Sequence, residues 1–295
     1  MEKIRVAIVG YGNIGRYALR AVEMASDEVC AGIVRRGGSA GGYRELDRYA
    51  VVSDIRQLEN VDVAIVAAPS RHVGEVVKTC LEAGVSTVDS FDIHTGIAAL
   101  RMELDEVARR NGVASVVSAG WDPGSDSVVR ALLAALAPEG ETFTNFGPGR
   151  SMGHTVAAKA VPGVRDAVSI TVPEGKGVHR REVYVVLDDG AEGDKVAAAI
   201  KADPYFASDH TEVRVVDDIA AFDTESHGVN LVREGAAGYR FSFDMRINNP
   251  ALTGQILACA ARAATRQRPG CYTLIEIPPV DLLPGDREDI IRKLV

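Results

Sequence analysis

The chain has 295 residues, of which 46% are hydrophobic and 25% charged, and its 33 basic and 41 acidic residues give a net charge of −8. These proportions are typical of a globular protein with one large or two modest domains, and they argue against disorder. An acidic chain without a clustered basic stripe argues against nucleic-acid binding. No apolar run approaches the roughly 18 residues of a membrane helix, and the N-terminus does not resemble a signal peptide.

The four cysteines are widely scattered along the chain, at Cys30, Cys80, Cys259 and Cys271. They form no CxxC pair, so they indicate neither a disulfide framework nor a zinc site. No other cluster of metal ligands is present in the sequence, and we expect no metal. A reducing cytoplasm is the expected location.

Short apolar strands alternate with helical patterns through the first part of the chain. The predicted strands are Ile4–Val9, Val29–Val34, Val61–Ala68, Ser86–Val88 and Val113–Val117, and the predicted helices begin near Ile14, Ser70 and Thr95. This alternation predicts an α/β domain with a doubly wound parallel sheet and right-handed crossovers.

After Pro138 the pattern changes to clustered strands with few helices. The predicted strands are Val168–Val172, Glu182–Leu187, Glu212–Val216 and Tyr239–Ile247, and the predicted helices are Lys195–Ala202 and Ala251–Arg266. This pattern predicts an α+β domain with a mainly antiparallel sheet. We expect a first domain at 1–120, a second at 121–249, and a C-terminal segment 250–295 that packs back on the first.

The run Gly10-Tyr11-Gly12-Asn13-Ile14-Gly15 directly follows the first predicted strand and opens a helix. G-x-G-x-x-G in this context predicts a Rossmann-type dinucleotide site, whereas the pattern alone would be weak in a chain with 29 glycines. Gly10 permits the tight turn, Gly12 lets a pyrophosphate approach the backbone, and Gly15 lets the helix pack on the strand. The N-terminus of the helix then attracts the phosphates.

Arg35 and Arg36 stand at the end of the second strand, where enzymes that use NAD usually place an acid for the ribose 2′-hydroxyl. A guanidinium can pair with a 2′-phosphate, so these residues favour NADP, although two solvated surface arginines would look the same. Ser70, after the strand Val61–Ala68, is a further candidate cofactor contact. It is equally well explained as the start of a helix.

Two acidic residues follow neighbouring strands at their carboxyl ends, where ligands gather in open α/β sheets. Asp92 lies in Asp89-Ser90-Phe91-Asp92, and Asp122 lies in Gly120-Trp121-Asp122-Pro123-Gly124. Both could face a nicotinamide and bind an ammonium or accept its proton. Asp122 before Pro-Gly is also typical of a turn, and Asp92 could be a plain loop acid.

Together these segments resemble the meso-diaminopimelate dehydrogenase family over essentially the whole chain. The resemblance is carried by Gly10–Gly15, Arg35-Arg36, Val88–His94, Ser118–Gly124, Phe146–Gly153 and Ile170–Pro173. It implies a homodimeric NADP-dependent enzyme that oxidatively deaminates the D-centre of meso-2,6-diaminopimelate. The products would be L-2-amino-6-oxopimelate, which cyclises to tetrahydrodipicolinate, and ammonia, in lysine biosynthesis.

The resemblance also implies roles for individual residues. Asp92 and Asp122 would be the catalytic acids at the reacting ammonium. Thr171, Arg181 and His227 would hold the carboxylate of the distal L-centre. The other implied substrate contacts are Trp121, Phe146, Met152, Gly153 and Asn249.

Some of these residues have simpler explanations, and two features depart from the family pattern. Arg181 follows two other basic residues, Thr171 could merely favour a strand, and His227 could lie in a loop. Met152 stands where the family pattern has a polar glutamine, and the segments 174–179 and 227–229 are short. These departures leave open a D-amino acid dehydrogenase of broader specificity.

Three other classes remain as alternatives. A sugar-type or homoserine-type dehydrogenase is one, but the first domain has no Lys-Pro dipeptide of the sugar type. Dihydrodipicolinate reductase is another, which lacks the Gly120–Gly124 run. A non-enzymatic Rossmann redox sensor would need a basic helix-turn-helix segment, and the acidic, strand-first N-terminus offers none.

Overall fold

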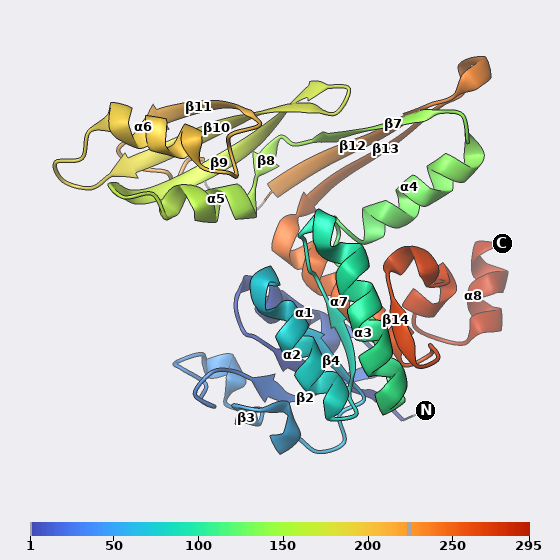
Figure 1. Cartoon of the computed structure of the whole chain (residues 1–295). Helices are drawn as coiled ribbons and strands as arrows, with labels where there is room; N and C mark the ends of the chain where they lie inside the picture. Colours follow the sequence, from blue (N-terminus) through green and yellow to red (C-terminus); the bar gives the residue numbers. More distant parts are fainter. Residues whose placement is uncertain (1, 223–225) are drawn as a thin grey trace. The chain divides into compact units, whose positions relative to one another are not determined.

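The computed structural model describes residues 2–222 and 226–295. The chain, drawn in Figure 1, divides into two compact units. The first unit comprises the chain up to Ala131 together with Pro250–Val295, and the second comprises Leu132–Asn249. The sequence pattern predicts the end of the first domain at residue 120, whereas the first unit continues to Ala131. The turn that follows Gly120 is hydrogen-bonded to the first unit, because the Ser125 N–H donates to the Gly120 carbonyl at 3.0 Å. That the second domain binds the substrate and forms the dimer stays a prediction.

The first unit is built on a parallel sheet that has seven strands within the described residues, in the order β14-β6-β5-β4-β1-β2-β3. The strands are β1 (Ile4–Val9), β2 (Glu28–Val34), β3 (Val51–Val52), β4 (Val63–Val66), β5 (Ser86–Asp89), β6 (Ala114–Val116) and β14 (Gly270–Tyr272). The strand order reverses between β1 and β4. This is the point at which such sheets bind ligands beyond the carboxyl ends of their strands.

Helices cover both faces of this sheet. The α-helices are α1 (Asn13–Met24), α2 (Ser70–Glu82), α3 (Ile97–Asn111), α7 (Asn249–Ala264) and α8 (Arg287–Leu294), with α4 (Ser125–Leu136) running into the second unit. Short 3₁₀ turns lie at Arg44–Leu46, Ile55–Gln57, His94–Gly96, Leu274–Glu276 and Pro279–Leu282. Alternate residues of β1 enter opposite cores: Val6 and Ile8 pack with α1 and α7, and Ala7 and Val9 pack with α2 and α3. The predicted doubly wound α/β fold is confirmed.

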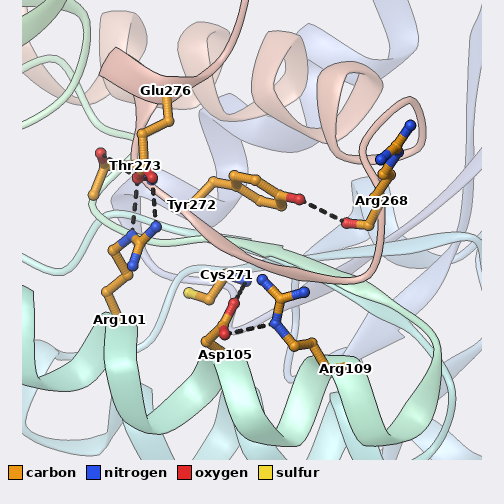
Figure 2. Close-up of polar contacts among 8 residues, drawn as sticks. All are labelled: Arg101, Asp105, Arg109, Arg268, Cys271, Tyr272, Thr273 and Glu276. Atoms are coloured by element: carbon orange, nitrogen blue, oxygen red, sulfur yellow. Dashed lines mark hydrogen bonds and ion pairs between the residues drawn. The ribbon is translucent and has the colours of Figure 1, made fainter.

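The C-terminal segment is part of the first unit because β14 extends the sheet beside β6. Figure 2 shows how α3 contacts this segment. Asp105 accepts the Cys271 N–H at 2.8 Å and the Arg109 Nε–H at 2.7 Å, and Arg101 Nε donates to Glu276 at 2.9 Å. Backbone pairing and side-chain bonds together therefore hold the edge strand in register.

The second unit, as far as residues 132–222 and 226–249 show, contains two sheets, β11-β10-β9-β8 and β13-β12-β7. Their strands are β7 (Glu141–Phe146), β8 (Gly149–Arg150), β9 (Val164–Gly175), β10 (Val178–Leu187), β11 (His210–Val215), β12 (Ser226–Glu234) and β13 (Arg240–Asn248). The helices are α5 (Met152–Lys159) and α6 (Gly193–Ala202), with a 3₁₀ turn at Ala236–Gly238. β10 is antiparallel to β9 and parallel to β11, while β12 is antiparallel to β7 and β13. The predicted mainly antiparallel α+β domain is confirmed, with two sheets in place of one.

Four strands and helices of the second unit are absent from the sequence prediction: β7, β8, α5 and β12. β12 corrects the loop alternative for His227, which lies within this strand and is 5% exposed. Gly228 interrupts the apolar alternation there. A side chain at Gly228 would stand 2.7 Å from the Gly147 carbonyl oxygen, so the backbones pack too closely for any other residue.

None of the helices in the described part of the chain has both the length and the apolar character needed to cross a membrane.

Candidate active site

The glycine turn after β1 is shaped by two close backbone approaches. Gly10 has φ +94°, and a Cβ there would lie 2.6 Å from the Ala67 oxygen. A Cβ on Gly15 would lie 2.1 Å from the Gly10 oxygen, so α1 packs directly on the turn. Gly12 differs, because a Cβ there would meet nothing within 4 Å. The turn therefore leaves open space at Gly12, as a bound pyrophosphate requires.

Gly12 is also the N-cap of α1, and no side chain caps this end of the helix. The first-turn N–H groups can therefore face an anion, which the helix dipole also favours. The neighbouring Tyr11 turns inward: it is buried, and its hydroxyl donates to Glu45 at 3.3 Å. Burial and Glu45 raise the pKa of Tyr11 to about 12. Asn13 and Ile14 form the first turn of α1.

Arg35 and Arg36 differ in their surroundings although both directly follow β2. Arg35 donates from Nη1 to the carbonyls of Ser39 and Ala40, at 2.8 and 2.6 Å, and its guanidinium lies 4.9 Å from the Tyr43 ring centroid. Arg36 is exposed, and no hydrogen bond or ion pair holds it within the described chain. Arg35 therefore orders the glycine-rich loop, and Arg36 is available to an external anion.

Ser70 and Asp92 lie together in the first unit. The Ser70 hydroxyl donates to Asp92 Oδ1 at 2.5 Å, and the Asp92 N–H donates back to the Ser70 hydroxyl at 3.3 Å. The exposed Asp92 carboxylate is thus oriented by the first residue of α2. Two predicted site residues that are 22 positions apart are brought into contact by the parallel pairing of β4 and β5.

Asp89 connects the loops that carry the two candidate acids. It is fully buried at the end of β5, and its Oδ1 accepts the N–H of Phe91 at 2.9 Å and of Ser118 at 3.1 Å. Burial raises its pKa to about 6. Asp89 belongs to the segment Val88–His94, but no role for it could be predicted, because a buried acid that bonds to two loops has no characteristic sequence spacing.

Asp122 is half-buried in a turn that includes a cis Asp122–Pro123 peptide bond and follows the buried Trp121. Its carboxylate lies 3.5 Å from Arg130 Nη2, and the same nitrogen lies 2.7 Å from Asp126 Oδ2. Asp126 is fully buried, and its Oδ1 accepts the Ser127 hydroxyl at 3.3 Å. Burial and the nearby Asp122 raise the pKa of Asp126 to about 8.

The sequence analysis does not predict the ion pair between Asp126 and Arg130. Their i, i+4 spacing on α4 is the signal that could have indicated it.

In the second unit, Phe146 and His227 meet where β7 pairs with β12. Their ring centroids lie 6.4 Å apart, edge to face, and Phe146 also packs against His179 at 5.4 Å. His179 Nε2 accepts the Phe146 N–H at 2.7 Å. His227 Nδ1 lies 2.7 Å from the Gly228 oxygen. The structure thus groups an aromatic wall that the sequence predicted only as separate residues.

Thr171 and Arg181 are directly opposite each other in the β9–β10 register. Arg181 Nη1 donates to the hydroxyl of Thr171, and Arg181 Nε donates to Asp209 Oδ2 at 2.6 Å. Thr171 is 1% exposed. The alternative of a solvated Arg181 is therefore wrong, since β-pairing places a buried hydroxyl on its guanidinium.

Met152 and Gly153 begin α5, and a Cβ on Gly153 would lie 3.2 Å from the Tyr205 ring. Asn249 is the first residue of α7 and the last of the second unit. Among the described residues, no group of three or more His, Cys, Asp or Glu side chains is arranged to hold a metal ion.

Comparisons with known proteins agree with these two units. The sequence profile of the diaminopimelic acid dehydrogenase C-terminal domain matches residues 120–178. The profile of an oxidoreductase family with an NAD-binding Rossmann fold matches residues 4–89. The first unit is therefore a Rossmann nicotinamide-dinucleotide-binding domain.

Full-length relatives are also found. The meso-diaminopimelate D-dehydrogenase of Bacteroides fragilis is 56% identical over 299 residues, covering 100% of both chains. The enzyme of the same name from Corynebacterium glutamicum is 31% identical over 326 residues, covering 99% of both. The solved structure of C. glutamicum DAP dehydrogenase in complex with DAP matches with a TM-score of 0.88, covering 100% of both chains. An engineered D-amino acid dehydrogenase bound to NADP⁺ matches with 29% identity and a TM-score of 0.82, covering 99% of this chain and 100% of the other.

Similarity of this extent over whole chains leads to one conclusion: the protein belongs to the meso-diaminopimelate D-dehydrogenase family, and it is an amino-acid dehydrogenase.

Proposed function

We propose that the protein catalyses the reversible NADP-dependent oxidative deamination of the D-centre of meso-2,6-diaminopimelate. Ammonia and L-2-amino-6-oxopimelate, which cyclises to tetrahydrodipicolinate, are the products, and the reaction belongs to lysine biosynthesis. The observation that carries this proposal is the 56% identity over the full length of the B. fragilis enzyme of that name. The scattered free cysteines fit a cytoplasmic enzyme, and the family resemblance supports a homodimer.

NADP is supported as the cofactor by the open space at Gly12 and by the exposed Arg36. No acid adjoins the two arginines at the end of β2 to repel a 2′-phosphate. The similar engineered dehydrogenase binds NADP⁺. When bound, NADP⁺ supplies the hydride acceptor of the reaction. Ser70, whose hydroxyl is engaged with Asp92, would contact the cofactor through the start of α2.

The acids of the first unit act on the reacting ammonium. Asp92 or Asp122 takes a proton from it, directly or through water, because a protonated amine cannot expel a hydride. Loss of the α-hydrogen as hydride leaves a substrate imine, and water then adds and releases ketone and ammonia. The Ser70 hydroxyl holds Asp92 in one orientation, which favours a productive geometry.

The basic and polar groups of the second unit bind the distal centre. Arg181 can pair with its carboxylate, and Thr171 and His227 add polar contacts. This assignment explains why a half-buried arginine stands beside a buried threonine. The remaining proposed substrate contacts are Trp121, Phe146, Met152, Gly153 and Asn249.

A second candidate is a D-amino acid dehydrogenase of broader specificity. The alignment with the C. glutamicum relative spans 326 residues, more than the 295 of this chain, so the relative carries insertions that this chain lacks. Met152 cannot donate a hydrogen bond where a glutamine could. We therefore expect measurable turnover of other D-amino acids, or of bulky 2-oxo acids in the reverse direction. Inactivity on a panel of such substrates would remove this candidate.

The test is to mix protein, NADP⁺ and meso-diaminopimelate and to follow NADPH absorbance. We expect turnover with the meso isomer, none with the LL isomer, and weaker activity with NAD⁺. Asp122→Asn should lower the turnover number about 10²- to 10⁴-fold, the usual contribution of a positioned acid or base. Unchanged turnover would remove Asp122 from the mechanism, and no NADPH with meso-diaminopimelate in the unmodified protein would overturn the proposed function.

A further inference from the structure

Arg181 is held by a residue that no sequence motif contains, Asp209. The Arg181 Nε donates to Asp209 Oδ2 at 2.6 Å, and the side chains are 14% and 25% exposed, respectively. Asp209 directly precedes β11, whose Thr211 lies opposite Arg181 in the parallel register with β10. Neighbouring strands on both sides of β10 thus each provide an acceptor for one guanidinium, Thr171 from β9 and Asp209 from the start of β11.

A second ionisable neighbour of Asp209, His154, does not compete for its charge. His154 Nε2 lies 3.7 Å from Asp209 Oδ2, and His154 Nδ1 lies 2.8 Å from the Ser151 hydroxyl. Burial and the positive charge of Arg181 lower the pKa of His154 to about 4, so its imidazole is neutral near pH 7. The carboxylate of Asp209 is therefore paired with Arg181 at neutral pH.

These two bonds fix the guanidinium plane and leave part of its edge available. Nε is bonded to Asp209 and one Nη1 hydrogen is bonded to Thr171, whereas Nη2 makes no hydrogen bond within the described residues. A carboxylate can thus bind the N–H groups of Nη1 and Nη2. An unrestrained arginine loses side-chain rotamer entropy when it is ordered, and Asp209 removes much of this cost before the substrate arrives.

We propose that Asp209 is a positioning residue that determines specificity: it holds Arg181 in the orientation that binds the distal carboxylate of a dicarboxylic substrate. It thereby separates meso-diaminopimelate from D-amino acids with an apolar side chain. The proposal rests on the proposed function for the identity of the substrate, but the Arg181–Asp209 contact itself does not.

The test compares Asp209→Asn with a matched control, Glu182→Gln. Glu182 lies on β10 next to Arg181 and pairs with Arg180 at 2.8 Å, so the control removes an equivalent carboxylate from the neighbouring arginine. With meso-diaminopimelate, Asp209→Asn should raise KM on the order of tenfold, the usual effect of one bond to a charged group, and change kcat less than twofold. With D-norleucine, KM should be unchanged, and the control should leave both substrates unaffected.

A second measurement is independent of activity. Hydrogen exchange of the Arg181 Nε–H, followed by NMR in the full chain, should be slow in the unmodified protein and fast in Asp209→Asn. Exchange that is equally fast in both, an unchanged KM for meso-diaminopimelate, or an equal rise in KM for both substrates would overturn the positioning role. If the unmodified protein does not turn over meso-diaminopimelate but the exchange difference is present, the proposed function and the substrate assignment fail while the positioning of Arg181 stands.

Discussion

The glycine turn and the Arg181 cluster reach defined geometries by opposite routes. The turn is contiguous: six residues, Gly10–Gly15, contain the positive φ, the close helix approach and the open position. The cluster is dispersed, because Thr171, Arg181 and Asp209 come from β9, β10 and the residue before β11. In the turn the geometry is fixed by the residues themselves, whereas in the cluster it is fixed by strand register. A substitution in the turn should therefore affect folding or cofactor binding according to its own position, whereas substitutions in the cluster should affect substrate binding.

The largest effect is expected from Gly15→Ala. A Cβ at 2.1 Å from the Gly10 oxygen forces α1 away from the turn, because the obstacle is backbone. We expect a loss of about 3 kcal/mol in the free energy of unfolding, the cost of severe overpacking, despite the better helix propensity of alanine. Urea unfolding followed by circular dichroism measures this loss.

Gly12→Ala is the matched control within the same turn. A Cβ there meets nothing within 4 Å and the backbone has φ −90°, so stability should change by less than about 1 kcal/mol. The same Cβ would occupy the space proposed for the pyrophosphate, and the Kd for NADP⁺ should rise about tenfold or more, a loss comparable to one charge-assisted hydrogen bond. If Gly12→Ala bound NADP⁺ normally, or if Gly15→Ala unfolded like the unmodified protein, the contrast between the two glycines would be wrong.

A smaller effect on stability is expected at Asp122 and Asp126. Their contact resembles the glycine turn in being local in sequence, and it resembles the Arg181 cluster in depending on tertiary structure. The two acids are four residues apart, but the burial of Asp126 comes from tertiary packing. The pKa of Asp126 is raised from 3.8 to about 8 by burial and by Asp122, while Arg130 opposes this shift. The folded state therefore binds more protons than the unfolded state between these values, and this contribution to stability is lost as the pH rises from about 4 through 8.

Asp126→Asn should remove that pH dependence, because asparagine does not ionise. Thermal unfolding between pH 4 and 8 should show a flatter curve for the variant than for the unmodified protein. The other acids with raised pKa values, Asp89 and Glu28, are present in both proteins and cancel in the difference. Parallel curves over this range would show that Asp126 does not keep its proton in the folded state.

The sequence predicts the turn and most of the first unit well, because there the hydrophobic periodicity of each strand or helix ends where glycine or proline residues begin a turn. Ile4–Val9 is predicted with the bounds that β1 has, and the glycine motif follows it directly. β12 escapes prediction because Gly228 breaks its alternation for a contact with Gly147, a residue of a distant segment. Among the site residues, the pattern suggested Thr171 and Arg181 only through a family resemblance. The pattern did not indicate Asp209, because the residue spacing within each strand does not predict how two strands align with each other.

The smallest effect is expected from Thr171→Val, which tests whether register alone aligns Arg181. Valine fills the same buried position on β9 but offers no acceptor to Arg181 Nη1, while the bond to Asp209 remains. KM for meso-diaminopimelate should rise three- to tenfold with kcat nearly unchanged, as expected for one hydrogen bond of about 1 kcal/mol. Ser169→Ala is the control, since Ser169 is a buried hydroxyl on the same face of β9, opposite Val183 and not Arg181. A similar rise in KM for both variants would mean that strand packing, and not the hydroxyl of Thr171, sets the affinity.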